Sequence, residues 1–305
     1  MILRTFCLLL TSLTLCGSVQ AGVWERLKNA FVSEEKPQPP KIKVLLAHDI
    51  PAATLEVKGS YNIYDPYKSK RLATRFVPKG NRIQALSTGL KWGEEFPGVY
   101  QIEIRPDEAS TVTTVNGCDY KGNIAIYDVG GSISVVNEVD LEDYLASMMP
   151  NKFNRPFAEE SLSAAAIAER THAFYTAQHS ENPYWHVRAE DVGYDGVRSE
   201  HTNPLVANAL TGTRYMVMSK TGIYEGVVTP FPVALVVSEK DPNFKKMSKI
   251  SIDDIDAMSR NGENAGRILS KTFPEASIAL TIGHINSQEQ VAELRVRDHV
   301  PRKAR

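Results

Sequence analysis

The chain has few cysteines, no basic surplus and no long apolar run after its first residues. Of its 3 cysteines, only Cys118 follows residue 21. A single thiol cannot form an intramolecular disulfide or build a structural zinc site alone. The formal net charge of -1 argues against a dedicated nucleic-acid binder. No later run approaches the roughly 20 apolar residues of a membrane-spanning helix. The fold must therefore rest on an apolar core, and a chain of this length can bury one.

The first 21 residues have the pattern of a cleavable secretory signal. Arg4 supplies a positive charge, residues 6–15 are almost entirely apolar or small, and Val19-Gln20-Ala21 offers a small-residue cleavage pattern. The sequence therefore predicts export, with cleavage after Ala21. Two alternatives stay open. The segment is a buried N-terminal helix, or Cys16 is lipidated and tethers the protein to the membrane.

The pattern of the chain changes twice after this segment. Residues 22–40 are polar and rich in proline, which predicts a linker. From residue 41, short runs alternate apolar and polar residues between turn signals, as half-buried strands do. The predicted strands cover residues 42–46, 54–57, 61–64, 99–104, 123–127 and 132–136. Gly130-Gly131 predicts a hairpin between the last two.

Helical patterns begin near Asp140. Acidic residues at 140–145 favour a helix start, and the alanine-rich run over 156–175 is the strongest helix of the chain. Residues 180–238 read as irregular chain with short strands, and Ser251 is a candidate N-cap of a later helix. These patterns predict an α+β fold, with mostly antiparallel short strands and a central Ala-rich helix. Residues 281–305 form a basic C-terminal tail.

Residues 120–173 carry the most specific pattern. Tyr120-Lys121-Gly122 precedes Val135-Val136-Asn137-Glu138-Val139 and Leu141-Glu142-Asp143-Tyr144-Leu145, and an alanine-rich run then ends in Arg170-Thr171. This order resembles the stage II sporulation protein D family (SpoIID/LytB, the amidase-enhancer family). Its usual pattern is Y-x-G, V-V-N-E-V-P-L-E-D-Y-L, V-V-P-S-E-M-P and E-A-L-K-A-Q-A-V-A-A-R-T-Y-A. Weaker similarity, including Tyr194-Asp195-Gly196, predicts that residues 41–280 form one SpoIID/LytB-like domain.

The resemblance implies action on bacterial peptidoglycan, in cell-wall remodelling or division. Enzymatic members of the family are lytic transglycosylases that cleave glycan strands stripped of stem peptides, and others are described as enhancers of cell-wall amidases. The implied location is the periplasm, and the implied partners are glycan strands and a cell-wall amidase. No cofactor and no metal are expected. The chemistry needs a carboxylic acid that protonates the glycosidic oxygen and then assists the sugar's own 6-hydroxyl.

The sequence departs from the family at the acid itself. The glutamate of V-V-P-S-E-M corresponds to Lys152, and a lysine, with an unperturbed pKa of ~10.4, gives up its proton poorly. The resemblance nevertheless marks Lys152 as the catalytic position, with Glu138 and Glu142 as candidate substitutes. Asp143, Glu159, Glu160 and Glu169 are further acids weighed as replacements, and the first three also have the ordinary interpretation of charges in the first turn of a helix. The residues implied in substrate binding are Arg170, Thr171, Tyr194 and Asp195.

Two hypotheses from different classes follow. The protein is a lytic transglycosylase whose acid has moved, or it is a glycan-binding module that has lost the acid and stimulates another wall hydrolase. The absence of a carboxylate within hydrogen-bond reach of the Lys152 ammonium would weaken the first hypothesis.

Two further patterns have ordinary interpretations beside functional ones. His172, His179 and His186 are spaced seven residues apart, which suggests zinc ligands or, more simply, surface and packed histidines. Pro183-Tyr184-Trp185 is either an aromatic surface that stacks on sugar rings or part of the core.

Overall fold

Strand β12 (Ile133–Asp140) lies near the middle of a seven-stranded sheet and pairs antiparallel with strands on both sides. In the computed structural model the described residues are 39–281 without 75, 201, 221–227 and 237–246, and they belong to one compact unit that begins at Pro39. The sheet also contains β13 (Val187–Arg188), β1 (Lys41–Ile50), β11 (Asn123–Asp128), β8 (Gln101–Pro106), β3 (Tyr61–Asp65) and β4 (Lys70–Thr74), in the order β13-β1-β12-β11-β8-β3-β4. Within this sheet, β1 and β13 are the one parallel pair, and the other neighbouring strands are antiparallel.

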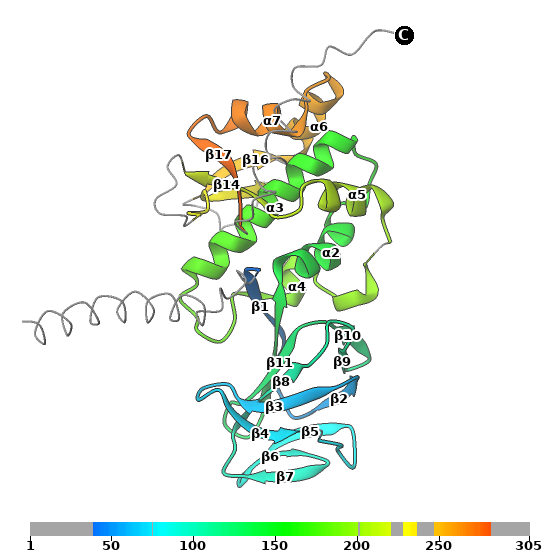
Figure 1. Ribbon diagram of the computed structural model, residues 1–305, viewed down its shortest axis with the longest axis vertical. Coiled ribbons are helices and arrows are strands. Elements are labelled where there is room, and N and C mark those ends of the chain that lie inside the picture. The colour runs from blue at the N-terminus through cyan, green and yellow to red at the C-terminus, as the bar shows by residue number, and fades with distance from the viewer. Residues whose placement is uncertain (1–38, 75, 201, 221–227, 237–246, 282–305) are drawn as a thin grey trace, which may run out of the picture. The chain divides into compact units, whose positions relative to one another are not determined.

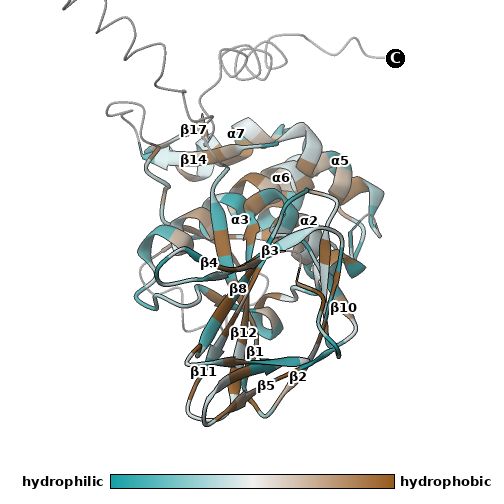
Figure 2. Ribbon diagram, turned by 60° about the horizontal axis from the view of Figure 1, so that its bottom comes forward, coloured by the Kyte–Doolittle hydropathy of each residue, from teal (hydrophilic) through white to brown (hydrophobic). Residues whose placement is uncertain are grey.

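The two faces of this sheet differ in chemistry. In β11, Ile124 and Ile126 are 0% exposed and belong to the core, whereas Asn123 and Tyr127 lie on the opposite face, as the two-residue period of a strand requires. Figure 2 shows hydrophobic segments along β8, β11 and β12. The predicted hairpin is confirmed, because β11 and β12 are joined through Gly130-Gly131.

A second sheet of six short strands follows the order β10-β9-β2-β5-β6-β7. Its strands are β10 (Cys118–Tyr120), β9 (Val112–Val115), β2 (Ala53–Lys58), β5 (Arg82–Leu86), β6 (Gly89–Trp92) and β7 (Glu94–Pro97). The sequence predicts only β2 among them. The indole of Trp92 is 0% exposed and its ring lies 6.1 Å from that of Tyr61 on β3, so this sheet shares its core with the seven-stranded sheet.

Helix α3 (Glu159–His179) is the central element of the helical part (Figure 1). It contains a run of alanines, from 164 to 166 and at 168, that are all 0% exposed. Small residues allow other elements to approach the helix closely, and a helix that is buried on nearly all sides lies inside a core. The other helices are α2 (Leu141–Lys152), α4 (Ala189–Val192), the 3-10 helix η1 (Gly196–Arg198), α5 (Pro204–Gly212), α6 (Ile252–Arg260) and α7 (Ala265–Thr272).

Two strand pairs complete the helical part. These are the antiparallel pair β14 (Met216–Lys220) and β17 (Ala276–Leu280) and the parallel pair β15 (Val233–Val236) and β16 (Ser248–Ser251). The predicted α+β class is confirmed. The interpretation of 180–238 as irregular chain with strands is wrong for α5, whose Asn203 side chain caps the first turn and whose Pro204 begins it.

The two Tyr-x-Gly motifs pack against each other. Gly122 and Gly196 both have positive φ, 79° and 67°. A Cβ on Gly122 would collide with the carbonyl of Glu138, and one on Gly196 with the carbonyl of Asp119. Only glycine fits these positions without strain. The close approach of Gly196 to Asp119 and Tyr120 thus packs the second turn against the first motif.

Several predicted segments lie outside the described residues. These are the signal at 1–21, the linker at 22–40 except its last two residues, and the basic tail at 281–305 except its first. Among the described helices, none is long and apolar enough to cross a membrane.

Candidate functional site

Lys152 ends helix α2 and meets an acidic side chain of helix α3. Its Nζ lies 2.6 Å from Oε1 of Glu169. The Glu169 side chain is 3% exposed and that of Lys152 is 25% exposed. Burying a carboxylate costs several kcal/mol unless a cation compensates it, so the ammonium of Lys152 stabilises the buried charge of Glu169. An ion pair therefore occupies the position at which the family carries its acid.

Both members of this pair differ from the family pattern quoted above. The pattern has glutamate at the position of Lys152 and alanine at the position of Glu169, directly before Arg-Thr. A carboxylate is thus present within hydrogen-bond reach of the Lys152 ammonium, supplied by α3 instead of α2.

A cleft of ≈ 210 Å³ lies on another side of helix α2. It is lined by Lys121, Glu142, Asp143, Ala146, Pro150, Glu200, Asn203, Val206, Ala207, Leu210, Thr211 and Arg214. Lys152 does not line it. Lys152 is two positions after Pro150, which corresponds to a rotation of about 200° around the helix. The cleft and the acid position are therefore on different faces of α2.

A lysine joins two carboxylates in this cleft. Lys121 Nζ lies 3.0 Å from Oδ1 of Asp143 and 2.9 Å from Oε2 of Glu200. Burial opposes the charge of Lys121, but its hydrogen bonds to Glu200 and Asp143 outweigh burial and raise its pKa. The sequence singles out neither Lys121 nor Glu200. The available signal was that Lys121 is the central residue of the first Tyr-x-Gly motif.

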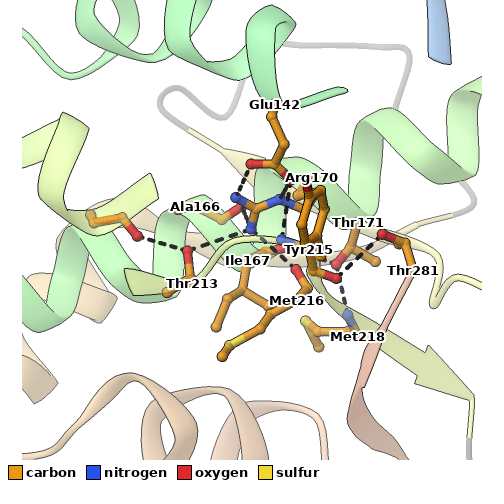
Figure 3. Close-up of polar contacts among 11 residues, drawn as sticks. Glu142, Ala166, Ile167, Arg170, Thr171, Thr213, Tyr215, Met216, Met218 and Thr281 are labelled. Atoms are coloured by element: carbon orange, nitrogen blue, oxygen red, sulfur yellow. Dashed lines mark hydrogen bonds and ion pairs between the residues drawn. The ribbon is translucent and has the colours of Figure 1, made fainter. Parts of the chain in front are cut away.

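Glu142 and Arg170, predicted for different roles, form one buried network (Figure 3). Arg170 is 0% exposed, and its Nε and Nη2 donate to the two oxygens of the Glu142 carboxylate at 2.8 and 2.9 Å. Its Nη1 donates to the carbonyl of Met216 at 3.2 Å. The Glu142 carboxylate also accepts the backbone N–H of Tyr215 at 3.2 Å. The network thus joins α2, α3 and the start of β14.

Thr171 extends this connection by one residue. Its hydroxyl donates to the carbonyl of Ile167 at 2.6 Å and accepts the backbone N–H of Met218 at 2.8 Å. Thr171 is 0% exposed, and these bonds attach strand β14 to helix α3.

Tyr194 and Asp195 form a separate group at the second Tyr-x-Gly motif. Tyr194 is 5% exposed, its hydroxyl donates to Oδ1 of Asn137 at 2.6 Å, and burial raises its pKa well above the usual value. The backbone N–H of Asp195 donates to Oγ of Ser147 at 3.2 Å, and its carboxylate accepts the hydroxyl of Ser199 at 2.7 Å. These bonds hold the motif against α2 and β12.

Glu138 lies apart from these groups, on β12 and on the sheet face opposite the core. Its side chain is 28% exposed and lies 3.7 Å from the ammonium of Lys41. The structure therefore brings Glu142, Arg170 and Thr171 together and places Lys152 with an acid of α3. The catalytic and substrate-binding roles of all these residues stay predictions.

The three evenly spaced histidines do not form one cluster in the part of the chain that the structure describes. His179 stacks on Tyr175 with ring centroids 4.0 Å apart, and His186 accepts a backbone hydrogen bond from Lys43. No three His, Cys, Asp or Glu side chains among the described residues gather as a metal-binding group. Within those residues, the zinc interpretation has no supporting geometry.

His186 predicts a pH dependence of stability. Burial, and then the charge of Lys43, lower the pKa of His186 to about 4, and its Nδ1 accepts the Lys43 N–H at 3.1 Å. In the unfolded chain histidine titrates near ~6.5, so the unfolded state takes up the proton first as the pH falls. We expect this contribution to be fully present above pH ~6.5 and to be lost as the pH falls towards 4. The difference between the melting temperatures of the wild type and His186→Asn, followed between pH 4 and 8, measures this contribution. The other titratable groups are the same in both proteins. Identical pH slopes would contradict the assignment.

Residues 129–219 match the model of the family described as Stage II sporulation protein, SpoIID. The matched segment includes β12, α2, α3 and α5, and so both the Lys152–Glu169 pair and most of the cleft lining. It confirms the resemblance in the sequence.

Three relatives match longer parts of the chain than the family model does. An uncharacterized protein of Chlamydia pneumoniae is 29% identical over 258 residues, 84% of this chain and 87% of the relative. One of Chlamydia muridarum is 29% identical over 269 residues, 87% of this chain and 84% of the relative. One of Brachyspira hyodysenteriae is 27% identical over 176 residues, 57% and 46% of the two chains. No solved structure matches.

Proposed function

We propose, from the premise that residues 129–219 are a SpoIID domain, that this protein is exported to the periplasm and acts there on peptidoglycan glycan strands. The family match supports a cell-wall-related role. The finer proposal is that the protein processes these strands as a lytic transglycosylase does. One observation carries it. Glu169 brings a carboxylate to 2.6 Å from the ammonium of Lys152, the residue at the family's acid position.

Cleavage of this kind needs one group that acts twice. The group first donates a proton to the glycosidic oxygen, the C–O bond breaks, and the leaving sugar keeps that proton. It then accepts the proton of the sugar's 6-hydroxyl, whose oxygen bonds to C1 and closes the anhydro ring. The group ends the cycle protonated, as it began.

A glutamic acid suits this cycle better than a lysine. Their unperturbed pKa values are ~4.3 and ~10.4, so an ammonium is an acid about six pKa units weaker. We therefore assign the proton transfers to Glu169 and a positioning role to Lys152. The 2.6 Å contact gives Lys152 this role, because its ammonium fixes the orientation of the Glu169 carboxyl group.

A second function is favoured by the same pair. With Lys152 in place, the more exposed ammonium is paired with the buried carboxyl group of Glu169, which is then engaged by Lys152 instead of by a glycosidic oxygen. A scaffold that keeps this arrangement when glycan binds would hold the strand without cutting it. It would then serve as a glycan-binding module that stimulates a cell-wall amidase.

Product analysis tests the proposal. The full chain is incubated with glycan strands freed of stem peptides and, separately, with intact sacculi, and anhydro ends are measured by mass spectrometry. We expect anhydro products from the wild type and a loss of at least about 100-fold in Glu169→Gln, the range of a general acid–base group. Glu159→Gln, an exposed acid on the first turn of the same helix, is the matched control and should cut normally.

Three outcomes count against parts of this proposal. Cleavage that persists in Glu169→Gln overturns the assignment of the acid. Binding to sacculi without products at any pH from 4 to 9 overturns the enzyme and supports the binding module. If the protein neither binds sacculi nor releases products, the peptidoglycan target itself is overturned.

A further inference from the structure

Four aromatic side chains from three distant segments lie together outside the cleft beside helix α2. They are His48 of β1, Tyr127 of β11, and Tyr184 and Trp185 of the loop after α3, and we call them the aromatic platform. Tyr127 and Tyr184 meet edge to face with centroids 5.1 Å apart, and His48 lies 5.3 Å from Trp185. Tyr184 is 44% exposed. A tyrosine exposed to this degree offers ring surface to a ligand, which a core residue does not.

The loop that presents the platform is fixed at both ends. The side-chain oxygen of Asn182 accepts the backbone N–H groups of Tyr184 and Trp185 at 2.9 and 3.3 Å. Lys43 donates its backbone N–H to His186 and its ammonium to the carbonyl of Pro183, both at 3.1 Å. A surface ordered before it binds loses little conformational entropy on binding, which favours affinity.

Polar side chains border the platform on the same face of the sheet. Tyr127 is paired with Gln101 on β8 and with Ser134 on β12, and the hydroxyl of Ser134 lies 2.8 Å from Nδ1 of His48. Paired residues of neighbouring strands share a face, and so do residues two apart on one strand. These side chains therefore line the platform's side of the sheet, opposite the core. Amide and hydroxyl groups beside exposed rings match a ligand that has both apolar faces and hydroxyl edges.

The charges on this face select among such ligands. Glu138 lies 3.7 Å from Lys41, and the buried carboxylate of Glu103 accepts from Arg105 at 2.6 Å and from Asn123 at 3.0 Å. Each of these two acids has a cation beside it, so neither adds an unpaired charge to this face, and a neutral sugar chain needs none.

We propose that the aromatic platform is a saccharide-binding surface, on which Tyr184 and Trp185 stack against the apolar faces of N-acetylhexosamine units. The proposal rests on the proposed function in that the glycan is peptidoglycan. Helix α3 connects the two places, since Glu169 and the end of the helix at His179 are ten residues, about 15 Å, apart along its axis. The platform thus holds a strand at a distance from the residues assigned to its cleavage.

Fluorescence titration with soluble oligomers of N-acetylglucosamine tests the platform directly. The chain has 3 tryptophans. Trp92 is 0% exposed and Trp185 lies on the platform, so a Trp24→Phe background leaves Trp185 as the reporter that a bound sugar can reach. We expect a saturable change of emission that Trp185→Phe removes. Tyr184→Ala should weaken binding about tenfold, the equivalent of one stacking contact of about 1.4 kcal/mol.

Leu205→Ala is the matched control, because Leu205 is 47% exposed on helix α5, an element that contributes no residue to the platform. Its affinity should equal that of the wild type. Wild-type affinity in both Tyr184→Ala and Trp185→Ala, or no binding of the oligomers at all, overturns the platform. Failure of the platform and failure of the proposed cleavage are distinguishable. If the protein releases no products but its oligomer binding depends on Tyr184, the enzyme assignment is overturned and the platform is supported.

Discussion

Arg170→Met is expected to destabilise the fold by about 3–5 kcal/mol, the cost of breaking a buried ion pair by removing one partner. The variant leaves the Glu142 carboxylate without its two charged hydrogen bonds, and the carbonyl of Met216 without a donor. Since a whole domain is stable by only about 5–15 kcal/mol, much of the stability is lost. Denaturant unfolding measures the change, and the melting temperature should fall by about 10 °C.

Two variants make this prediction specific. Arg170→Lys keeps a charge and loses the planar fork, so its stability should fall between wild type and Arg170→Met. Arg188→Met removes an exposed pair with Glu190, whose side chains are 44% and 73% exposed, and should cost less than about 1 kcal/mol. A loss below about 1 kcal/mol in Arg170→Met would mean that the network does not hold α2, α3 and β14 together.

Lys152→Met should cost about 3 kcal/mol, because it leaves the buried carboxylate of Glu169 without its cation. The double variant Lys152→Met/Glu169→Leu should recover most of this loss, since replacing both members of a buried pair by apolar groups is often neutral. Urea unfolding of the wild type, both single variants and the double variant completes a double-mutant cycle, whose coupling energy is expected to exceed about 1 kcal/mol.

The free energies of unfolding from this cycle also show whether a loss of activity reflects unfolding of a variant. Glu169→Gln keeps an amide beside Lys152, whose ammonium still reaches solvent, and should remain folded at assay temperature. A coupling energy near zero would show that the two side chains do not depend on each other. The positioning role proposed for Lys152 would then fail.

The regular part of the fold was predictable because it leaves local signals. Alternation marked the strands around Gly130-Gly131, and alanine content marked α3. Helix α5 carries an Asn203 cap and Pro204 at its start, but nine residues form a marginal helix alone and need tertiary packing to persist. Most strands of the six-stranded sheet have only three to five residues, too few for alternation to be distinctive.

The candidate site was predictable by position but not by environment. The family pattern singles out Arg170 and Thr171, yet a charged residue in sequence gives no sign that it is 0% exposed. Its burial depends on Glu142, one helix away, and only the fold brings the two together. The same holds for Lys152, since its neighbours in sequence do not reveal that an acid of α3 lies 2.6 Å from its ammonium.

The position of β12 inside the sheet determines whether the segment that matches the family model can be produced alone. Both strands that pair with β12 lie outside residues 129–219, and so does β17, the partner of β14. Excision of the matched segment would expose unpaired strand edges and apolar surface that the N-terminal strands now cover, and such edges promote aggregation. The matched segment is therefore not expected to fold on its own, and a truncation meant to isolate it should retain both β1 and β17.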